Sequence, residues 1–189
     1  MVIKQLRTYT FIAIIINGLC ISCTEPVDFN QVNDFEISPV IESSLIFLDE
    51  PANRFSDNEN ELTTIQDFVQ VDFFNNNFIV DNLIRAEFVF ETTNSINRTF
   101  QVQVDFLDSN NQIQHTFTFF TTASANNTNV VSNYTEVFQD NTLAALKNTS
   151  RLVFTLNMLP GTPINQNTTG RISVKSKAVF YFNIDNTTL

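Results

Sequence analysis

Apolar and polar residues alternate along much of the chain, and the alternation is most regular over residues 100–106. Phenylalanine and valine occupy the even positions of this stretch, and glutamine and aspartate occupy the odd ones. Successive side chains of a β-strand point to opposite faces, so a period of two predicts a strand with one buried face. Residues 112–121 continue as a second strand after the turn-forming segment 108–111 (DSNN). We therefore predict a β-hairpin over residues 98–121.

Weaker versions of the same pattern predict the remaining elements. Further strands are expected over residues 40–48, 67–74, 83–92, 151–158 and 172–184. A short helix is expected through Leu143 and Leu146, which are three residues apart, with Asn141 or Thr142 as its N-cap. The polar segments are expected to be loops, and they cover residues 49–64, 122–133 and 159–170. The chain is thus predicted to consist mainly of strands and loops.

About seven strands and one short helix predict an all-β fold. Short strands separated by polar turns favour an antiparallel β-sandwich with immunoglobulin-like architecture. The likeness concerns architecture only, since the Cys–Trp–Cys signature of the immunoglobulin core is absent. Composition agrees, because the 20 phenylalanines and many β-branched residues favour strands. A hydrophobic content of 43% in 189 residues suits one domain with a substantial core.

The N-terminal segment has the organisation of a secretory signal peptide. Lys4 and Arg7 supply a positive charge, and an apolar run follows over residues 11–16. The run ends at Asn17 and Gly18, well short of the roughly 20 residues that a helix needs to cross a bilayer. A signal peptide that is removed is therefore favoured over a transmembrane anchor.

The residues that follow resemble the lipobox of bacterial lipoprotein precursors. In that family a small residue precedes the cysteine that receives lipid, and Ser22 and Cys23 match these two positions. Cys20 departs from the pattern, because leucine is usual there. The resemblance implies that residues 1–22 are removed and that Cys23 carries fatty acids such as palmitate. The alternative is a redox or metal-binding Cys20–Cys23 pair, but the chain has no further cysteine to complete a metal site.

These features divide the chain into a signal peptide (1–22), a lipidated cysteine with a tether (23–38) and one β-sandwich domain (39–189). The resemblance implies a place in the bacterial cell envelope, attached to the outer membrane by lipid. Glu25 and Asp28 are similar to the acidic export signal of Bacteroidetes-type surface lipoproteins, but Pro26 and Val27 interrupt the stretch and a solvated, flexible tether is the favoured interpretation. The sequence does not decide whether the protein lies on the periplasmic or on the surface-exposed side of the outer membrane.

The net charge of the chain limits the classes of molecule that it can bind. The formal net charge is −10, and removal of Lys4 and Arg7 makes it −12. Nucleic acid is excluded as a partner, because phosphate contacts need clustered basic residues. A nucleotide is excluded as well, since the chain has 3 glycines and no glycine-rich phosphate loop. No cofactor is predicted. The membrane is contacted through the N-terminal lipid, and an envelope protein is the candidate partner.

Catalytic residues are not predicted. His115 is the single histidine, and by alternation it shares a strand face with Ile113, Phe117 and Phe119. A catalytic triad needs a histidine oriented by a carboxylate and facing a nucleophile, and a zinc site needs several His or Cys ligands. His115 is therefore expected to lie at the edge of the core, and the protein is expected not to be an enzyme.

One acidic stretch is a candidate calcium site. Asp57, Glu59 and Glu61 place carboxylates at alternate positions, and calcium prefers oxygen ligands. The stretch lacks the glycine and the ligand spacing of an EF-hand loop, so a solvated acidic loop is the favoured interpretation. No other metal site is predicted.

Two functions remain from the sequence. The first is a non-enzymatic binding, assembly or structural role in the envelope. The second is a glycan-binding or glycan-cleaving surface protein, for which the absence of tryptophan is unfavourable although phenylalanine could replace it. A solvent-facing group of phenylalanines with carboxylates would favour the second, and a smooth polar surface would favour the first.

Overall fold

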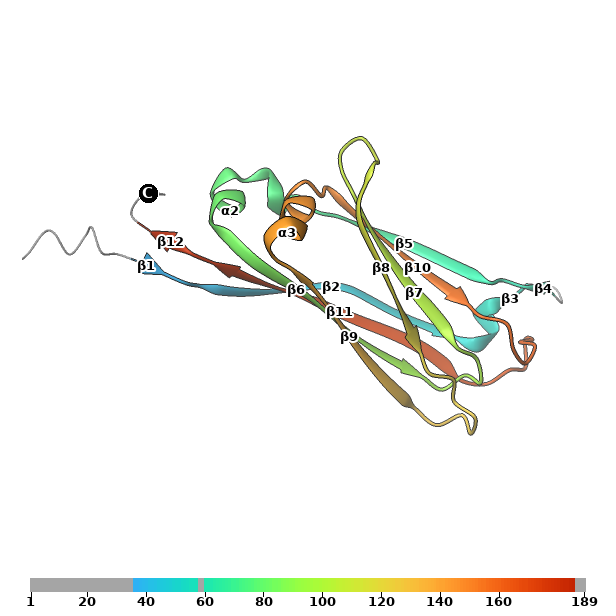
Figure 1. Cartoon of the computed structure of the whole chain (residues 1–189). Helices are drawn as coiled ribbons and strands as arrows, with labels where there is room; N and C mark the ends of the chain where they lie inside the picture. The colour runs from blue at the N-terminus through green and yellow to red at the C-terminus, as the bar shows by residue number, and fades with distance from the viewer. Residues whose placement is uncertain (1–35, 58–59, 186–189) are drawn as a thin grey trace, which may run out of the picture. The chain divides into compact units, whose positions relative to one another are not determined.

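The computed structural model describes residues 36–57 and 60–185, which fold into two four-stranded antiparallel sheets (Figure 1). The first sheet contains, in spatial order, β2 (Val40–Pro51), β11 (Arg171–Phe182), β6 (Leu83–Asn94) and β9 (Val130–Phe138). The second sheet contains β5 (Thr64–Gln70), β10 (Arg151–Met158), β7 (Phe100–Leu107) and β8 (Ile113–Thr121). Two small pairs complete the strands, namely β1 (Glu36–Ile37) with β12 (Ile184–Asp185) and β3 (Ser56–Asp57) with β4 (Asn60–Glu61). The prediction of an all-β, antiparallel sandwich is confirmed.

The order of the strands defines a jelly roll. The long strands pair as a nested series, with β2 on β11, β5 on β10, β6 on β9, and β7 on β8 at the centre. The same four pairs would form if the chain were one long hairpin. That hairpin is folded into two sheets, in which β11 also pairs with β6 and β10 also pairs with β7. An eight-stranded double sheet built in this way is a jelly roll, whose connections differ from those of an immunoglobulin domain.

Two element counts differ from the prediction within the described residues. Eight long strands are present rather than about seven, because β9 begins inside the segment 122–133 that was expected to be a loop. A second helix, α2 (Asn77–Asn82), accompanies the predicted one, α3 (Asp140–Lys147). Gln139 rather than Asn141 or Thr142 is the N-cap of α3. Both helices lie at the end of the sandwich where the β7–β8 turn lies (Figure 1).

In the acidic segment 49–64, the described residues 49–57 and 60–64 are more ordered than a solvated loop. Strand β2 extends to Pro51, and a 3-10 helix, η2 (Ala52–Phe55), follows it. Phe55 is fully buried, and its ring centroid lies 5.0 Å from that of Phe100. The burial of Phe55 fixes this segment against the core, so the expectation of a loop here was wrong. The end of the predicted tether is also structured, because β1 pairs with β12.

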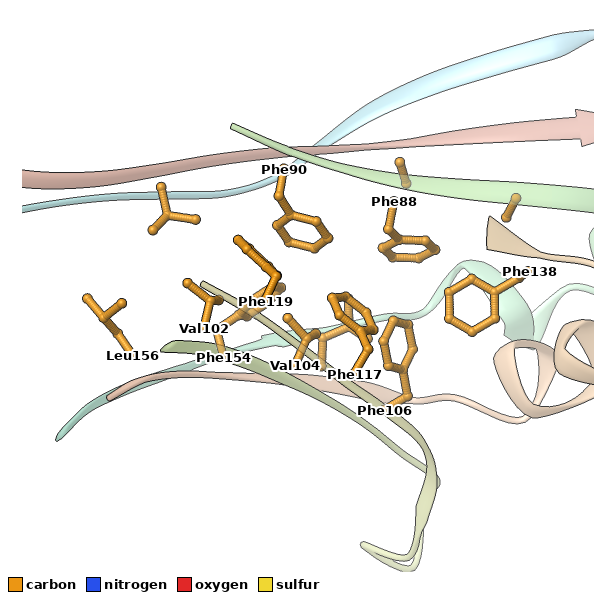
Figure 2. Packing of buried hydrophobic residues seen from close by; sticks show 14 of the residues in the cluster. Phe88, Phe90, Val102, Val104, Phe106, Phe117, Phe119, Phe138, Phe154 and Leu156 are labelled. Carbon is orange, nitrogen blue, oxygen red and sulfur yellow. The ribbon is translucent and has the colours of Figure 1, made fainter. Parts of the chain in front are cut away.

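The core lies between the two sheets and is rich in phenylalanine (Figure 2). The predicted hairpin is present, and its even-numbered residues from Phe100 to Phe106 are all at most 2% exposed. The Phe106 ring lies 5.2 Å from Phe88 and 5.0 Å from Phe138. Such ring pairs add about 0.5–1.5 kcal/mol each beyond the burial of their area. The alternation seen in the sequence therefore selects the inner face of this sheet.

Two isoleucines that the alternation places inside the core are exposed because of β-bulges. Ile84 is 53% exposed and Ile113 is 60% exposed. The register shifts beside each of them, so that one strand has an extra residue and the next side chain changes face. Leu83, which is 1% exposed, occupies the core position that Ile84 leaves.

None of the helices among the described residues has the length and apolar character required to cross a membrane.

Candidate functional site

The outer faces of the two sheets carry different chemistry. On the β2–β11–β6–β9 sheet the outer face is covered by charged pairs. They are Arg171–Asp49, Lys177–Glu42, Lys175–Glu91 and Arg85–Glu87. Exposed pairs of this kind are worth about 0–1 kcal/mol each and leave both charges satisfied. This face therefore offers mainly paired charges to solvent.

The outer face of the β5–β10–β7–β8 sheet consists mainly of amides and hydroxyls. Across β5 and β10, the Thr64 hydroxyl donates to the Asn157 side-chain oxygen at 3.0 Å, and the Gln66 amide donates to the Thr155 hydroxyl at 3.0 Å. Asp105 on β7 accepts from the Thr116 hydroxyl at 2.6 Å. These side chains project from paired strands, so the face is a rigid array of hydrogen-bonding groups.

A depression on this face is the candidate binding site. It has a volume of about 260 Å³ and is lined by Gln66, Asp67, Phe68, Arg151 and Val153. The strand pairing brings these residues together, because Phe68 on β5 lies opposite Val153 on β10. The Phe68 side chain is 60% exposed, and the Arg151 guanidinium lies 5.8 Å from the centre of its ring. An apolar ring, an amide and a cation thus border one shallow hollow.

Arg151 is unusual among the arginines that the structure describes. The other four each form an ion pair with a carboxylate, namely Arg54–Glu50, Arg85–Glu87, Arg98–Glu61 and Arg171–Asp49. Arg151 forms no such pair with any residue of 36–57 and 60–185. Its Nη2 instead donates to the Asn111 side-chain oxygen at 2.7 Å. Its buried Nε has no hydrogen-bond partner among the described residues.

The β7–β8 turn holds Asn111 in place. The Asp108 carboxylate accepts hydrogen bonds from the backbone N–H groups of Asn110 at 2.8 Å and Gln112 at 2.9 Å. Asn111 has a φ of 62°, a left-handed conformation that asparagine tolerates better than most residues. The predicted turn segment 108–111 therefore also fixes the position of the Arg151 guanidinium.

His115 lies in a separate site at the edge where β8 and β9 meet. Its Nε2 is 2.7 Å from Glu136 Oε1, and the Tyr134 hydroxyl donates to Glu136 Oε2 at 2.6 Å. Tyr134 stacks on Phe119 with ring centroids 4.9 Å apart. Burial, with a smaller contribution from Glu136, raises the pKa of Tyr134 to about 12. His115 is at the edge of the core, as expected, and these contacts close this side of the sandwich.

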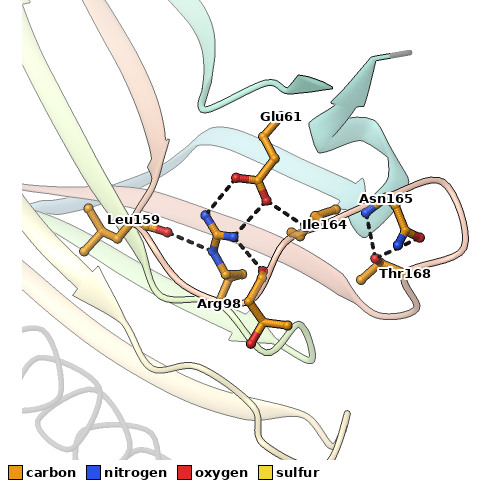
Figure 3. Close-up of polar contacts among 7 residues, drawn as sticks. Glu61, Arg98, Leu159, Ile164, Asn165 and Thr168 are labelled. Carbon is orange, nitrogen blue, oxygen red and sulfur yellow. Dashed lines mark hydrogen bonds and ion pairs between the residues drawn. The ribbon is translucent and has the colours of Figure 1, made fainter. Parts of the chain in front are cut away.

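A buried arginine connects the loops (Figure 3) at the end of the sandwich that lies opposite α2 and α3 in Figure 1. Arg98 is 3% exposed; its Nε donates to the Leu159 carbonyl at 2.8 Å and its Nη1 to the Thr162 carbonyl at 2.6 Å. Nη1 also contacts Glu61 Oε1 at 2.9 Å. A Cβ added at Gly161 would lie 3.0 Å from Arg98 Cδ, so glycine leaves room for this side chain. Sequence analysis did not identify this network.

The three candidate calcium ligands have different surroundings. Glu61 Oε1 accepts both the Arg98 guanidinium and the Ile164 backbone N–H at 2.7 Å. The Ile164 hydrogen bond, assisted by Arg98, lowers the pKa of Glu61. Asp57 pairs with Asn60 in the β3–β4 ladder, and Glu59 lies outside the described residues. No group of three or more metal-ligating side chains gathers within the described ranges, and Glu61 serves instead to connect loops.

The lipidation candidate Cys23 also lies outside the described residues, as does Cys20. Of the predicted tether, residues 23–38, the structure describes only the part from Glu36 onward. The anchoring of the protein is therefore an inference from the sequence of its first 23 residues.

No protein-family model matches the chain, and no characterised protein matches its sequence. A candidate secreted protein of Parabacteroides distasonis ATCC 8503 is 11% identical, with a TM-score of 0.47, over 62% of this chain and 37% of that one. A chain of the infectious bursal disease virus particle is 9% identical, with a TM-score of 0.46, over 80% of this chain and 32% of that one. The enzymatically active domain of a tailspike protein from bacteriophage CBA120 is 10% identical, with a TM-score of 0.33, over 78% of this chain and 19% of that one. The chain thus spans well under half the length of each of these proteins.

Proposed function

We propose that the protein is a lipid-anchored envelope protein with a non-enzymatic binding role, and that its ligand is a carbohydrate bound at the Phe68 depression. The order of positive charge, apolar run, Ser22 and Cys23 supports the anchor. The observation that carries the ligand class is the outer face of the β5–β10–β7–β8 sheet. An exposed phenylalanine lies there beside the Arg151 guanidinium, on a face whose other side chains are mainly amides and hydroxyls.

Sugars match this chemistry in two ways. A pyranose ring has a face of C–H groups, which can lie on an aromatic ring, and a rim of hydroxyls, which both donate and accept hydrogen bonds. Phe68 offers the apolar surface, and Gln66 offers an amide with two donors and an acceptor. A volume of about 260 Å³ is suited to one sugar ring and part of its neighbour rather than to a larger ligand.

The location of these groups on strands strengthens the proposal. Phe68 and Gln66 lie on β5, whose backbone is paired with β10 along its whole length. Side chains on a paired strand lose little further freedom when a ligand binds, so more of the contact energy contributes to affinity. Jelly rolls include lectin domains, but the fold alone does not assign function, and the proposal rests on the depression.

The test is binding of a panel of oligosaccharides to the full lipidated chain in detergent, followed by calorimetry on those that bind. Phe68→Ala should weaken binding by at least about twofold, because aromatic stacking contributes about 0.5–1.5 kcal/mol. The matched control is Phe47→Ala, since Phe47 is 65% exposed on the opposite sheet and should leave affinity unchanged. Absence of binding to any saccharide, or equal losses in the two variants, would overturn the proposal.

A further inference from the structure

We infer that the sugar bound at the Phe68 depression carries a carboxylate, as uronic acids do, and that Arg151 is the residue that binds it. The inference rests on the proposed carbohydrate function and adds the charge of the ligand. It follows from the absence of a carboxylate partner for Arg151 among the described residues, where the other four arginines each have one.

An arginine without a carboxylate is unexpected in this chain. The chain has 20 acidic and 10 basic residues. Each of the other four arginines in the described ranges forms an ion pair with a carboxylate. The guanidinium is always charged in proteins and is best satisfied by a carboxylate or phosphate. Arg151 therefore has unused capacity for an anion at the border of the depression.

The guanidinium is also held in position. One Nη2 hydrogen bonds to Asn111, and the cation lies 5.8 Å from the centre of the Phe68 ring. Nη1 and the second N–H of Nη2 remain to donate to a ligand, and a planar guanidinium can give two parallel hydrogen bonds to one carboxylate. An anion placed beside Phe68 would therefore meet a donor group that is already oriented.

The nearby carboxylates do not block such a ligand. Asp67 accepts the backbone N–H of Phe68, and strand alternation directs its side chain away from the outer face. Asp105 lies on the neighbouring strand β7, opposite Val153, and both of its oxygens accept hydrogen bonds, from the Gln103 amide and the Thr116 hydroxyl. The net charge of −10 opposes long polyanions, so a short or terminal acidic sugar is the ligand that fits.

The ring and the carboxylate would be recognised together. Phe68 faces the sugar ring, Gln66 bonds a hydroxyl, and Arg151 bonds the carboxylate attached to the same ring. A neutral sugar would use the first two contacts only. Hydrogen bonds to charged groups contribute about 1.5–3 kcal/mol, so the acidic sugar should bind at least about tenfold more tightly.

The experiment compares oligogalacturonate and oligoglucuronate with the same oligosaccharides after reduction of their carboxyl groups. Calorimetry on the full chain in detergent should give at least about tenfold tighter binding of one acidic form. Arg151→Gln should remove this preference, measured as the ratio of the affinities for the acidic and the neutral form. Arg151→Lys keeps the charge but loses the planar fork, and should retain part of the preference. Arg171→Gln, on the opposite sheet, is the control and should retain all of it.

The outcomes separate the two proposals. Equal binding of acidic and neutral forms, both weakened by Phe68→Ala, would overturn the role of Arg151 and leave carbohydrate binding intact. Absence of binding to every oligosaccharide would overturn both. Competition by a simple dicarboxylate such as succinate, as strong as that of the acidic sugar, would identify a general carboxylate site and overturn the assignment to a saccharide.

Discussion

Replacing Arg98 by methionine should destabilise the fold strongly, although Arg98 is remote from the proposed ligand. The substitution keeps an unbranched apolar chain but removes the hydrogen bonds to the Leu159 and Thr162 carbonyls and the ion pair with Glu61. Arg98 is 3% exposed, so water cannot replace these contacts. Breaking a fully buried ion pair by removing one partner costs about 3–5 kcal/mol. The Glu61 side chain is 30% exposed, so water can partly solvate it, and we expect a smaller loss of unfolding free energy of about 2–3 kcal/mol.

Arg171→Met provides a matched control. Arg171 also contacts both oxygens of a carboxylate, that of Asp49, at 2.9 and 2.8 Å. Its side chain is 55% exposed and that of Asp49 is 36% exposed, so this pair should be worth only about 0–1 kcal/mol. Urea unfolding of a chain that begins after Cys23 would measure both losses, with the slope of each transition as a check on two-state behaviour. Similar losses in the two variants would refute the argument from burial.

Acid should reduce the contribution of Glu61. The Ile164 N–H and Arg98 lower its pKa in the folded state, so its stabilising effect is complete above the unfolded pKa of about 4.3. That effect is lost as the pH falls through the folded pKa, because the protonated carboxyl no longer pairs with the guanidinium. The difference in stability between the wild-type chain and Glu61→Gln should therefore shrink from pH 6 toward pH 3. A difference that stays constant over this range would contradict the assignment.

Two further predictions concern the anchor and the core. Cys23→Ala should abolish fatty-acid labelling of the chain and Cys20→Ala should not; the opposite pattern would show that the cleavage site is misplaced. Phe106→Ala should cost about 3–5 kcal/mol in urea unfolding, because Phe106 is fully buried among aromatic rings. Gln103→Ala, on the outer face of the same strand, should cost about 0.5 kcal/mol, and equal losses at the two positions would contradict the inner and outer assignment of β7.

The sequence predicted the strands whose inner faces are mostly apolar, and it missed the strand whose inner face carries three polar side chains in succession. Strand β9 directs Ser132, Tyr134 and Glu136 toward the other sheet, where they lie half-buried at the edge of the sandwich. Their partners, such as His115 on β8, come from distant parts of the chain. A polar residue satisfied by a cross-sheet contact looks the same in a sequence as one that faces solvent. This explains why the segment was expected to be a loop.

The candidate site could be predicted only in part for a related reason. Phe68 stands next to Val69, and two adjacent apolar residues in an alternating strand indicate that one of them faces outward. The sequence contained that signal. It did not contain the pairing that sets β5 beside β10, on which the meeting of Phe68 and Arg151 depends. Arg98 gave no signal, because burial of an arginine is decided by the carbonyls that surround it.

The two outer faces together support a division of roles. On the β2–β11–β6–β9 sheet, Arg171, Lys175 and Lys177 are each paired with a carboxylate, so an incoming anion would have to displace an existing partner. On the β5–β10–β7–β8 sheet, Arg151 has no partner of that kind among the described residues, and its neighbours are amides, hydroxyls and the Phe68 ring. An anion would thus gain a charge-assisted contact on the second face without breaking one. The same contact on the first face would bring little net free energy, because pairing there is already complete.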